Sequence, residues 1–257
     1  MCSINHDKKT IFFHVPKTGG TFIRENLEKY YNFNFYKIKR PDHEEITNRF
    51  LYIEKIKKHY HSGNKIFGIL EYFKNSPQSR NMGNYEYMTT SDYINEKIDM
   101  TDEKWNSYYK FTFIRNPYER FISGYSYVMK RLNTNIEFEK YIDLKEYITD
   151  FEYMHTFMPQ IKHISLNGKI MCNYIGKLEN LESDFKEVLL KIGFNESEIN
   201  HSNEKKNVTK HLSISHYIKN QEILDKLNII LKEDIEVFNF KKIDKIEDIN
   251  NINNINI

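Results

Sequence analysis

A short turn near the N-terminus carries residue types suited to binding an anion. Residues 16–21 read Pro-Lys-Thr-Gly-Gly-Thr, between an apolar run at 10–15 and a stretch whose apolar residues have helical spacing. A glycine turn leading from a strand into a helix exposes backbone N–H groups, and the helix dipole adds to their attraction for negative charge. Lys17 precedes the glycines, whereas the lysine of the nucleoside-triphosphate motif follows them. Taken alone, the turn is equally typical of an ordinary helix cap.

A second basic segment follows another predicted strand. Residues 109–114 read Tyr-Lys-Phe-Thr-Phe-Ile, which predicts a strand, and Arg115-Asn-Pro comes directly after it. Because residues beyond the C-terminal end of a parallel strand face the ligand crevice, we expect Arg115 in that crevice. Ser123 lies one to two turns into the next predicted helix and can face the same way, so the pair suits a second phosphate. The alternative for Arg115 is a surface salt bridge, which is the favoured interpretation of Arg120.

The rest of the chain alternates between strand and helix patterns. Strands are predicted at residues 10–15, 32–40, 65–70, 109–114 and 169–175. Helices are predicted from residue 22 onward and at 46–60, 118–132, 178–192 and 215–238, with Gly193 as a C-cap. This alternation predicts an α/β fold with a parallel sheet covered by helices on both faces. With no repeat or dividing linker, residues 1–247 are predicted to form one domain, and 248–257 a frayed Asn/Ile tail.

Composition excludes several classes of protein. Lys and Arg number 38 against 36 Asp and Glu, a net charge of +2, which argues against a nucleic-acid partner. Aromatic residues make up 15% of the chain, which argues against disorder, and two cysteines cannot build a disulfide framework. No apolar stretch is long enough for a membrane helix. We expect a soluble, cytoplasmic protein. A Golgi or membrane-anchored protein whose anchor had been removed would have the same sequence features.

Together the two basic segments resemble those of a known enzyme family. FFHVPKTGGTFI, residues 12–23, resembles the 5′-phosphosulfate loop of sulfotransferases that use 3′-phosphoadenosine 5′-phosphosulfate (PAPS), and FTFIRNPYERFISGYSY, residues 111–127, resembles their 3′-phosphate motif. The likeness is to the carbohydrate-type branch, which includes heparan 2-O-sulfotransferases and bacterial relatives. Three weaker likenesses follow in the family's order, at residues 155–160, 175–185 and 234–240.

The resemblance implies a P-loop-type three-layer fold and a specific chemistry. It implies transfer of a sulfuryl group from PAPS, as co-substrate, to a hydroxyl, less often an amine, of an acceptor that is expected to be a carbohydrate. No metal is implied, because a sulfuryl group carries less charge than a phosphoryl group. Lys17 is expected to neutralise the departing nucleotide. The remaining expected donor contacts are Thr18, Gly19, Gly20, Thr21 and Phe22 at the 5′-phosphate, and Arg115 and Ser123 at the 3′-phosphate.

Three residues are candidates for the general base that takes the proton of the acceptor. His43, just past the strand predicted at 32–40, is the first choice, because the pKa of histidine lies near neutrality. We expect that strand to lie directly beside the strand at 10–15, with its C-terminal end facing the same crevice. Glu71 is second and His155 third. The family often has a histidine where residues 87–90 here read Tyr-Met-Thr-Thr. Two alternatives therefore remain: a P-loop kinase or NTPase with an atypical loop, and a nucleotide-binding module without catalysis. The sequence does not indicate the oligomeric state.

Overall fold

The fold is described from a computed structural model, which places residues 2–36, 102–131, 133–145, 153, 155–166, 168–199 and 212–249. All structural statements below concern these residues. The predicted strand at 65–70, the predicted helix at 46–60, and the base candidates His43 and Glu71 lie outside them.

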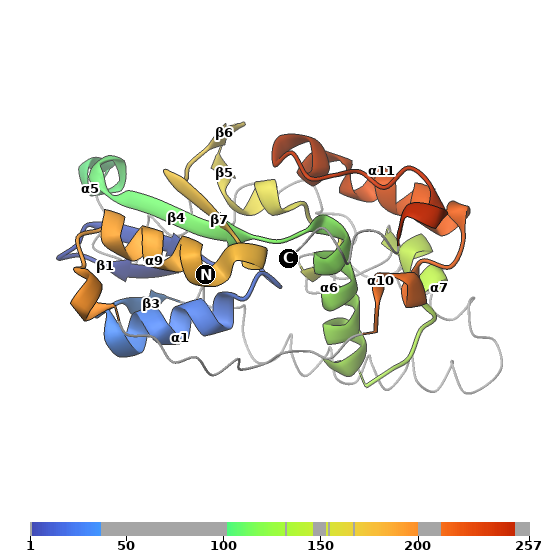
Figure 1. Cartoon of the computed structure of the whole chain (residues 1–257), viewed down its shortest axis with the longest axis horizontal. Coiled ribbons are helices and arrows are strands. Elements are labelled where there is room, and N and C mark those ends of the chain that lie inside the picture. Colours follow the sequence, from blue (N-terminus) through green and yellow to red (C-terminus); the bar gives the residue numbers. More distant parts are fainter. Residues whose placement is uncertain are drawn as a thin grey trace, which may run out of the picture.

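A five-stranded sheet forms the centre of the molecule, in the order β3-β1-β2-β4-β7 (Figure 1). Three of its strands are mutually parallel: β2 (Thr10–Phe13), β4 (Tyr109–Ile114) and β7 (Tyr174–Lys177). Phe13 of β2 lies opposite Thr112 of β4, so the two strands end side by side. The predicted α/β architecture is confirmed, with a mixed sheet whose centre is parallel.

The other two strands correct the predicted strand order. β1 (Cys2–Asn5) pairs antiparallel with β2 on one side and with β3 (Asn34–Tyr36) on the other. We expected the strand at 32–40 directly beside the first strand, but β1 stands between them. Because β1 is antiparallel to both neighbours, β3 runs in the same direction as β2. The C-terminal ends of β2 and β3 therefore lie at the same edge of the sheet. The sequence did not predict β1, because polar Ser3 and Asn5 alternate with its apolar residues although all four are buried.

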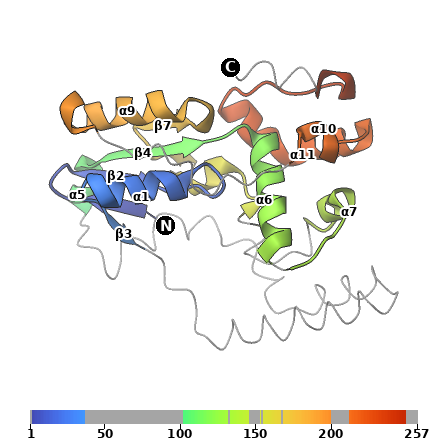
Figure 2. The same cartoon turned by 60° about the horizontal axis from the view of Figure 1, so that its bottom comes forward.

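Helices cover both faces of the sheet, because alternate residues of each strand point to opposite sides. On one face lie α1 (Gly20–Tyr30) and α9 (Leu181–Lys191), which Figures 1 and 2 show beside the sheet. Their buried residues form one cluster with Phe12, Phe111 and Phe113. On the other face, α5 (Asp102–Ser107) and the 3₁₀ turn η4 (Gln160–His163) cover residues that include Phe13.

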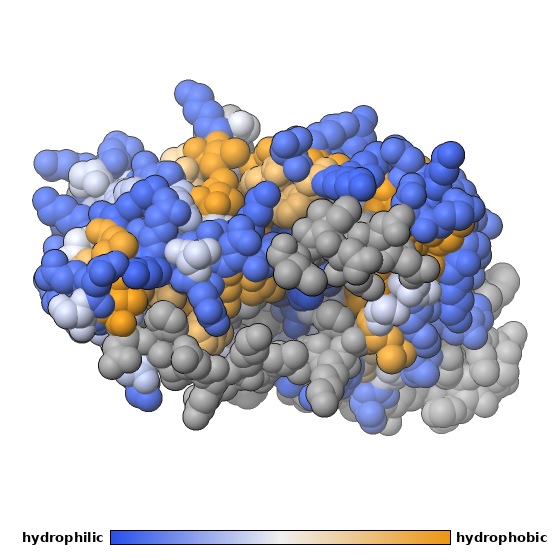
Figure 3. All heavy atoms as spheres, in the orientation of Figure 1, coloured by the Kyte–Doolittle hydropathy of each residue, from blue (hydrophilic) through white to orange (hydrophobic). Residues whose placement is uncertain are grey.

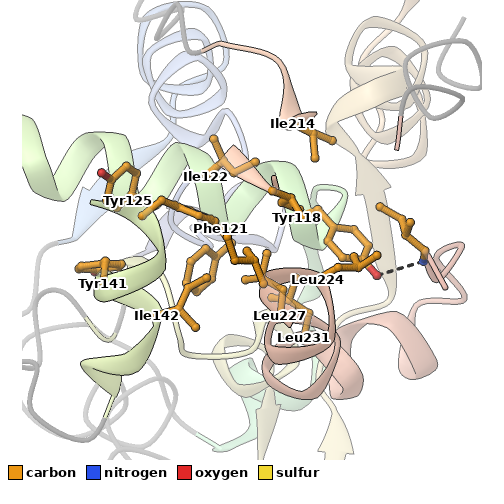
Figure 4. Packing of buried hydrophobic residues seen from close by; sticks show 14 of the residues in the cluster. Tyr118, Phe121, Ile122, Tyr125, Tyr141, Ile142, Ile214, Leu224, Leu227 and Leu231 are labelled. Carbon is orange, nitrogen blue, oxygen red and sulfur yellow. Dashed lines mark hydrogen bonds between the residues drawn. The ribbon is translucent and has the colours of Figure 1, made fainter. Parts of the chain in front are cut away.

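A second group of helices packs beyond the C-terminal end of the parallel strands (Figure 1). It comprises α6 (Pro117–Arg131), α7 (Phe138–Asp143), α10 (Ile214–Tyr217) and α11 (Gln221–Val237). Figure 4 shows their apolar side chains meeting around Phe121, with the Tyr118 hydroxyl accepting a hydrogen bond from the backbone of Ile243. Ile249, in the predicted tail, is buried in the same cluster.

Several predicted boundaries change. The strand predicted at 169–175 is two strands, because β6 (Lys169–Ile170) pairs with β5 (Ser165–Leu166) and β7 begins only at Tyr174. The last predicted helix is divided into α10 and α11, since Asn220 adopts an extended conformation and caps α11 through the N–H of Ile223. The helix predicted at 178–192 opens with a 3₁₀ turn, η5 (Leu178–Asn180), and the predicted C-cap glycine, Gly193, has φ +87°. Two further 3₁₀ turns are η6 (Glu196–Glu198) and η7 (Ile246–Asp248).

Hydrophilic residues cover much of the described surface in the view of Figure 3, with smaller apolar areas between them. Within the described ranges, no helix combines the length and the apolar character needed to cross a membrane.

Candidate active site

The candidate site lies where the parallel strands end. The Lys17 turn follows β2, Arg115 follows β4, and Glu179 lies just after β7. Because these strands are parallel neighbours, their C-terminal ends lie at one edge of the sheet, the usual position of a ligand in such folds. The structure therefore brings together the two segments that the sequence analysis singled out.

The turn has the shape that its sequence predicts. Lys17 and Gly19 have φ of +70° and +75°, and the Thr18 hydroxyl donates to the Val15 carbonyl at 2.9 Å. Gly19 is the N-cap of α1, and it has no side chain that could cap the first N–H groups of the helix. Gly20 must be a glycine, because a Cβ at this position would overlap the ring of His14. The predicted contacts of Thr18, Gly19, Gly20, Thr21 and Phe22 with a 5′-phosphate stay predictions.

Lys17 is half-buried, and its ammonium group lies 4.3 Å from the centre of the Tyr127 ring. The pKa of Lys17 is lowered to about 8, mainly by burial and also by the positive charges of Arg115 and Arg120. Three basic groups therefore stand close enough to influence one another. An anion placed among them would offset the repulsion between their positive charges.

Arg115 holds an ion pair with Glu119, one turn further along α6. Its Nη2 and Nε lie 2.9 and 3.1 Å from Oε2 of Glu119. The salt bridge considered as an alternative for Arg115 is thus present, and a phosphate would share the guanidinium with Glu119 or replace it. Ser123 lies further along α6 and is only 4% exposed. The start of α6 is fixed by Asn116, whose side chain accepts a bond from the N–H of Tyr118 at 3.0 Å.

Arg120 corrects the sequence prediction. It is not on the helix surface but 1% exposed, because α6 is surrounded by other elements on nearly every side. Its Nε donates to the carbonyl of Pro16 at 3.1 Å, and its Nη1 donates to the carbonyls of Met158 at 3.0 Å and Thr156 at 3.4 Å. Burial lowers the pKa of Arg120 to about 10, so the guanidinium keeps its charge at neutral pH. Sequence reasoning missed this role because nothing in a local pattern marks an arginine as buried.

The weaker motifs supply three further supports for the Arg115 segment. The Gln160 side chain binds both backbone groups of Arg115, accepting from its N–H and donating to its carbonyl, each at 2.9 Å. Asp234 accepts from the backbone N–H of Gln160 at 2.8 Å. Glu179 accepts from the N–H of Asn116 at 2.6 Å. Each of the three segments with a weaker family resemblance thus contributes one side chain to this support.

Of the base candidates, only His155 falls within the described residues. It is 8% exposed, and its ring centre lies 5.0 Å from that of Tyr127, whose ring also contacts Lys17. His14 is also near the turn, but burial lowers its pKa to about 3, so it is neutral at physiological pH. In the part of the chain that the structure describes, no group of three His, Cys, Asp or Glu residues could hold a metal ion.

This architecture defines an α/β protein with two basic segments at the ends of adjacent parallel strands. Comparison with known proteins gives the family. A family model described as "Sulfotransferase family" matches residues 2–241, and the chain belongs to that family. An uncharacterized protein from Archaeoglobus fulgidus is 33% identical over 94 residues, which cover 36% of this chain and 73% of that protein. No solved structure matches the chain.

Proposed function

We propose that this sulfotransferase takes its sulfuryl group from PAPS and transfers it to a hydroxyl group of a carbohydrate. The observation that carries the donor assignment is the pairing of the Lys17 turn with Arg115 at the ends of adjacent parallel strands. PAPS has anionic groups on both the 5′ and the 3′ side of one ribose, and two neighbouring basic segments match that arrangement. The carbohydrate acceptor rests on the resemblance to the carbohydrate-type branch. In this proposal, residues 1–247 work as one domain in the cytoplasm.

The proposed reaction makes one bond and breaks one. The acceptor oxygen attacks sulfur, the bond from sulfur to the bridging phosphate oxygen breaks, and adenosine 3′,5′-bisphosphate leaves. Lys17 stabilises the negative charge that develops on the bridging oxygen, an interaction that is stronger in the transition state than in the ground state. Arg115 and Ser123 hold the 3′-phosphate throughout. No step requires a metal.

The proton of the acceptor hydroxyl needs a base, and we propose His43 for this role. The support is its position in the sequence, just beyond a strand whose observed start, β3, runs in the direction of β2. His43→Ala is expected to lower turnover about 10²–10⁴-fold and to leave nucleotide affinity unchanged. Normal turnover of this variant would move the role to Glu71 and then to His155.

The donor assignment is tested by ligand binding. A ligand at 100 times its Kd stabilises a protein by about 2.7 kcal/mol, and each kcal/mol raises the Tm of a chain of this size by about 2–4 °C. Adenosine 3′,5′-bisphosphate with EDTA is therefore expected to raise the Tm by about 5–10 °C. A shift with ATP and Mg²⁺ alone would instead support a P-loop kinase or NTPase. Binding without transfer of labelled sulfate to any of a panel of acceptors would support an inactive nucleotide-binding module.

A further inference from the structure

We propose that Arg120 and Asp234 are a buried pair of positioning residues, which hold the Lys17 turn and the Arg115 segment in fixed relation to each other. This inference rests on the proposed function, because it concerns the geometry of the donor site. It assigns a role to two charged residues that touch neither phosphate in the proposed reaction.

Arg120 acts on the Lys17 turn through the backbone. Its Nε binds the carbonyl of Pro16, the residue directly before Lys17, at 3.1 Å. Lys17 has φ +70°, a left-handed conformation that a residue other than glycine keeps only when its surroundings hold it there. The same guanidinium binds the carbonyl of Met158 at 3.0 Å. One rigid, planar group therefore fixes the turn against the segment that leads into η4.

Asp234 acts on Arg115 through Gln160. Its two carboxylate oxygens accept from the backbone N–H groups of Gln160 and Ile161, at 2.8 and 3.1 Å, and so fix the start of η4 to α11. The Gln160 side chain then binds the N–H and the carbonyl of Arg115. The direction in which Arg115 leaves β4 is set by this chain of bonds.

The two buried charges support each other. Burial lowers the pKa of Arg120 and raises that of Asp234, and in each case the charge of the partner opposes the effect of burial. The donor carries its two anionic groups on one ribose, so the turn and Arg115 must keep a fixed separation. A misplacement of about 1 Å in such a site can cost about 10²-fold in rate.

The test is Arg120→Lys, with Arg131→Lys at the exposed end of the same helix as its control. Lysine keeps the charge but lacks the planar fork that reaches two carbonyls at once. In single-turnover transfer from labelled donor, Arg120→Lys is expected to lower the rate about 10²-fold, and Arg131→Lys to leave it unchanged. In a Lys17→Ala background the effect of Arg120→Lys on the rate should disappear, because the group that it positions is gone.

Asp234→Asn tests the second branch with the Arg120 side chain itself unchanged. One of its two acceptors becomes a donor, so the Kd for adenosine 3′,5′-bisphosphate, measured by calorimetry, is expected to rise about tenfold. The rise should be absent in an Arg115→Ala background. This second branch also decides the inference if Arg120→Lys does not fold.

Three results would overturn the inference. The first is a folded Arg120→Lys or Asp234→Asn protein with wild-type rate and affinity. The second is a loss that is equally large with and without Lys17 or Arg115, because that would be a general effect on stability. The third is a wild-type protein that neither binds the nucleotide nor transfers sulfate, which would overturn the proposed function as well. Wild-type activity together with unaffected variants would refute the positioning role alone.

Discussion

The proposed role of Lys17 predicts that activity is lost as the pH rises through about 8. The pKa of Lys17 is lowered to about 8, first by burial and then by the charges of Arg115 and Arg120. A group with this pKa is about 90% protonated at pH 7 and about 10% protonated at pH 9. If the ammonium form of Lys17 stabilises the departing nucleotide, kcat/KM for the donor should fall about tenfold between these two values.

The two kinetic parameters should respond at different pH values. kcat/KM reports the ionisation of the free enzyme, and kcat reports that of the complex. The anionic donor beside Lys17 favours its protonated form, so the fall in kcat should move to higher pH than the fall in kcat/KM. The assay is initial-rate transfer of labelled sulfate in overlapping buffers from pH 6.5 to 10, at low and at saturating donor.

Lys17→Arg is the matched variant, because a guanidinium stays charged throughout this range. Whatever its absolute rate, its profile should be flat where that of the wild type falls. The reasoning would be refuted if Lys17→Arg kept the fall near pH 8, since another group would then be titrating. It would equally fail if the wild-type kcat/KM stayed constant up to pH 10, the range of an ordinary lysine.

Further substitutions separate binding, catalysis and folding. Arg115→Ala should raise the Kd for adenosine 3′,5′-bisphosphate about 10–100-fold, because it removes a charged hydrogen bond, with little change in kcat at saturating donor. Lys17→Ala should mainly lower kcat, and a change in apparent donor affinity alone would contradict its catalytic role. Gly124→Ala places a Cβ in overlap with the carbonyl of His155 and should cost about 1–3 kcal/mol in urea unfolding. Tyr118→Phe removes a hydroxyl that bonds both a side chain and the backbone, and should cost about 1–2 kcal/mol with unchanged nucleotide affinity.

The parts of the site that the sequence predicted are those set by local geometry. Two glycines between an apolar strand and a helical pattern are enough to predict the turn that joins β2 to α1. The position of Arg115 at the end of β4 follows from the strand alone, because the residue comes directly after it in the sequence. The same holds for Gly193, whose position after the last turn of α9 predicts its positive φ. In each case the structural consequence lies within a few residues of the signal.

The parts that the sequence did not predict depend on contacts between distant segments. β1 is buried because β2 and β3 flank it, and its Asn5 side chain binds the carbonyl of Tyr31, which no pattern in residues 2–5 indicates. Arg120 looks like a surface residue of an amphipathic helix until the helices around α6 are in place. Gln160 and Asp234 bond across 74 residues of sequence. A single sequence does not show which polar side chains become buried by contacts between distant segments.

These distant contacts explain why the weaker motifs accompany the two basic segments. A loop that binds phosphate through backbone and side-chain donors must point them in fixed directions, although loops are the least stable parts of a fold. Here the backbone of Arg115 is held by Gln160, and that of Asn116 by Glu179. The Gln160 contact uses a neutral amide, so a substitution that kept the size of Gln160 but lost both hydrogen bonds would leave the charges of the site unchanged and change the direction of Arg115. In the proposed function, the charges of the two segments attract the donor, and the residues behind them set the direction of its contacts. Direction is the part of the affinity that would distinguish one anionic nucleotide from another.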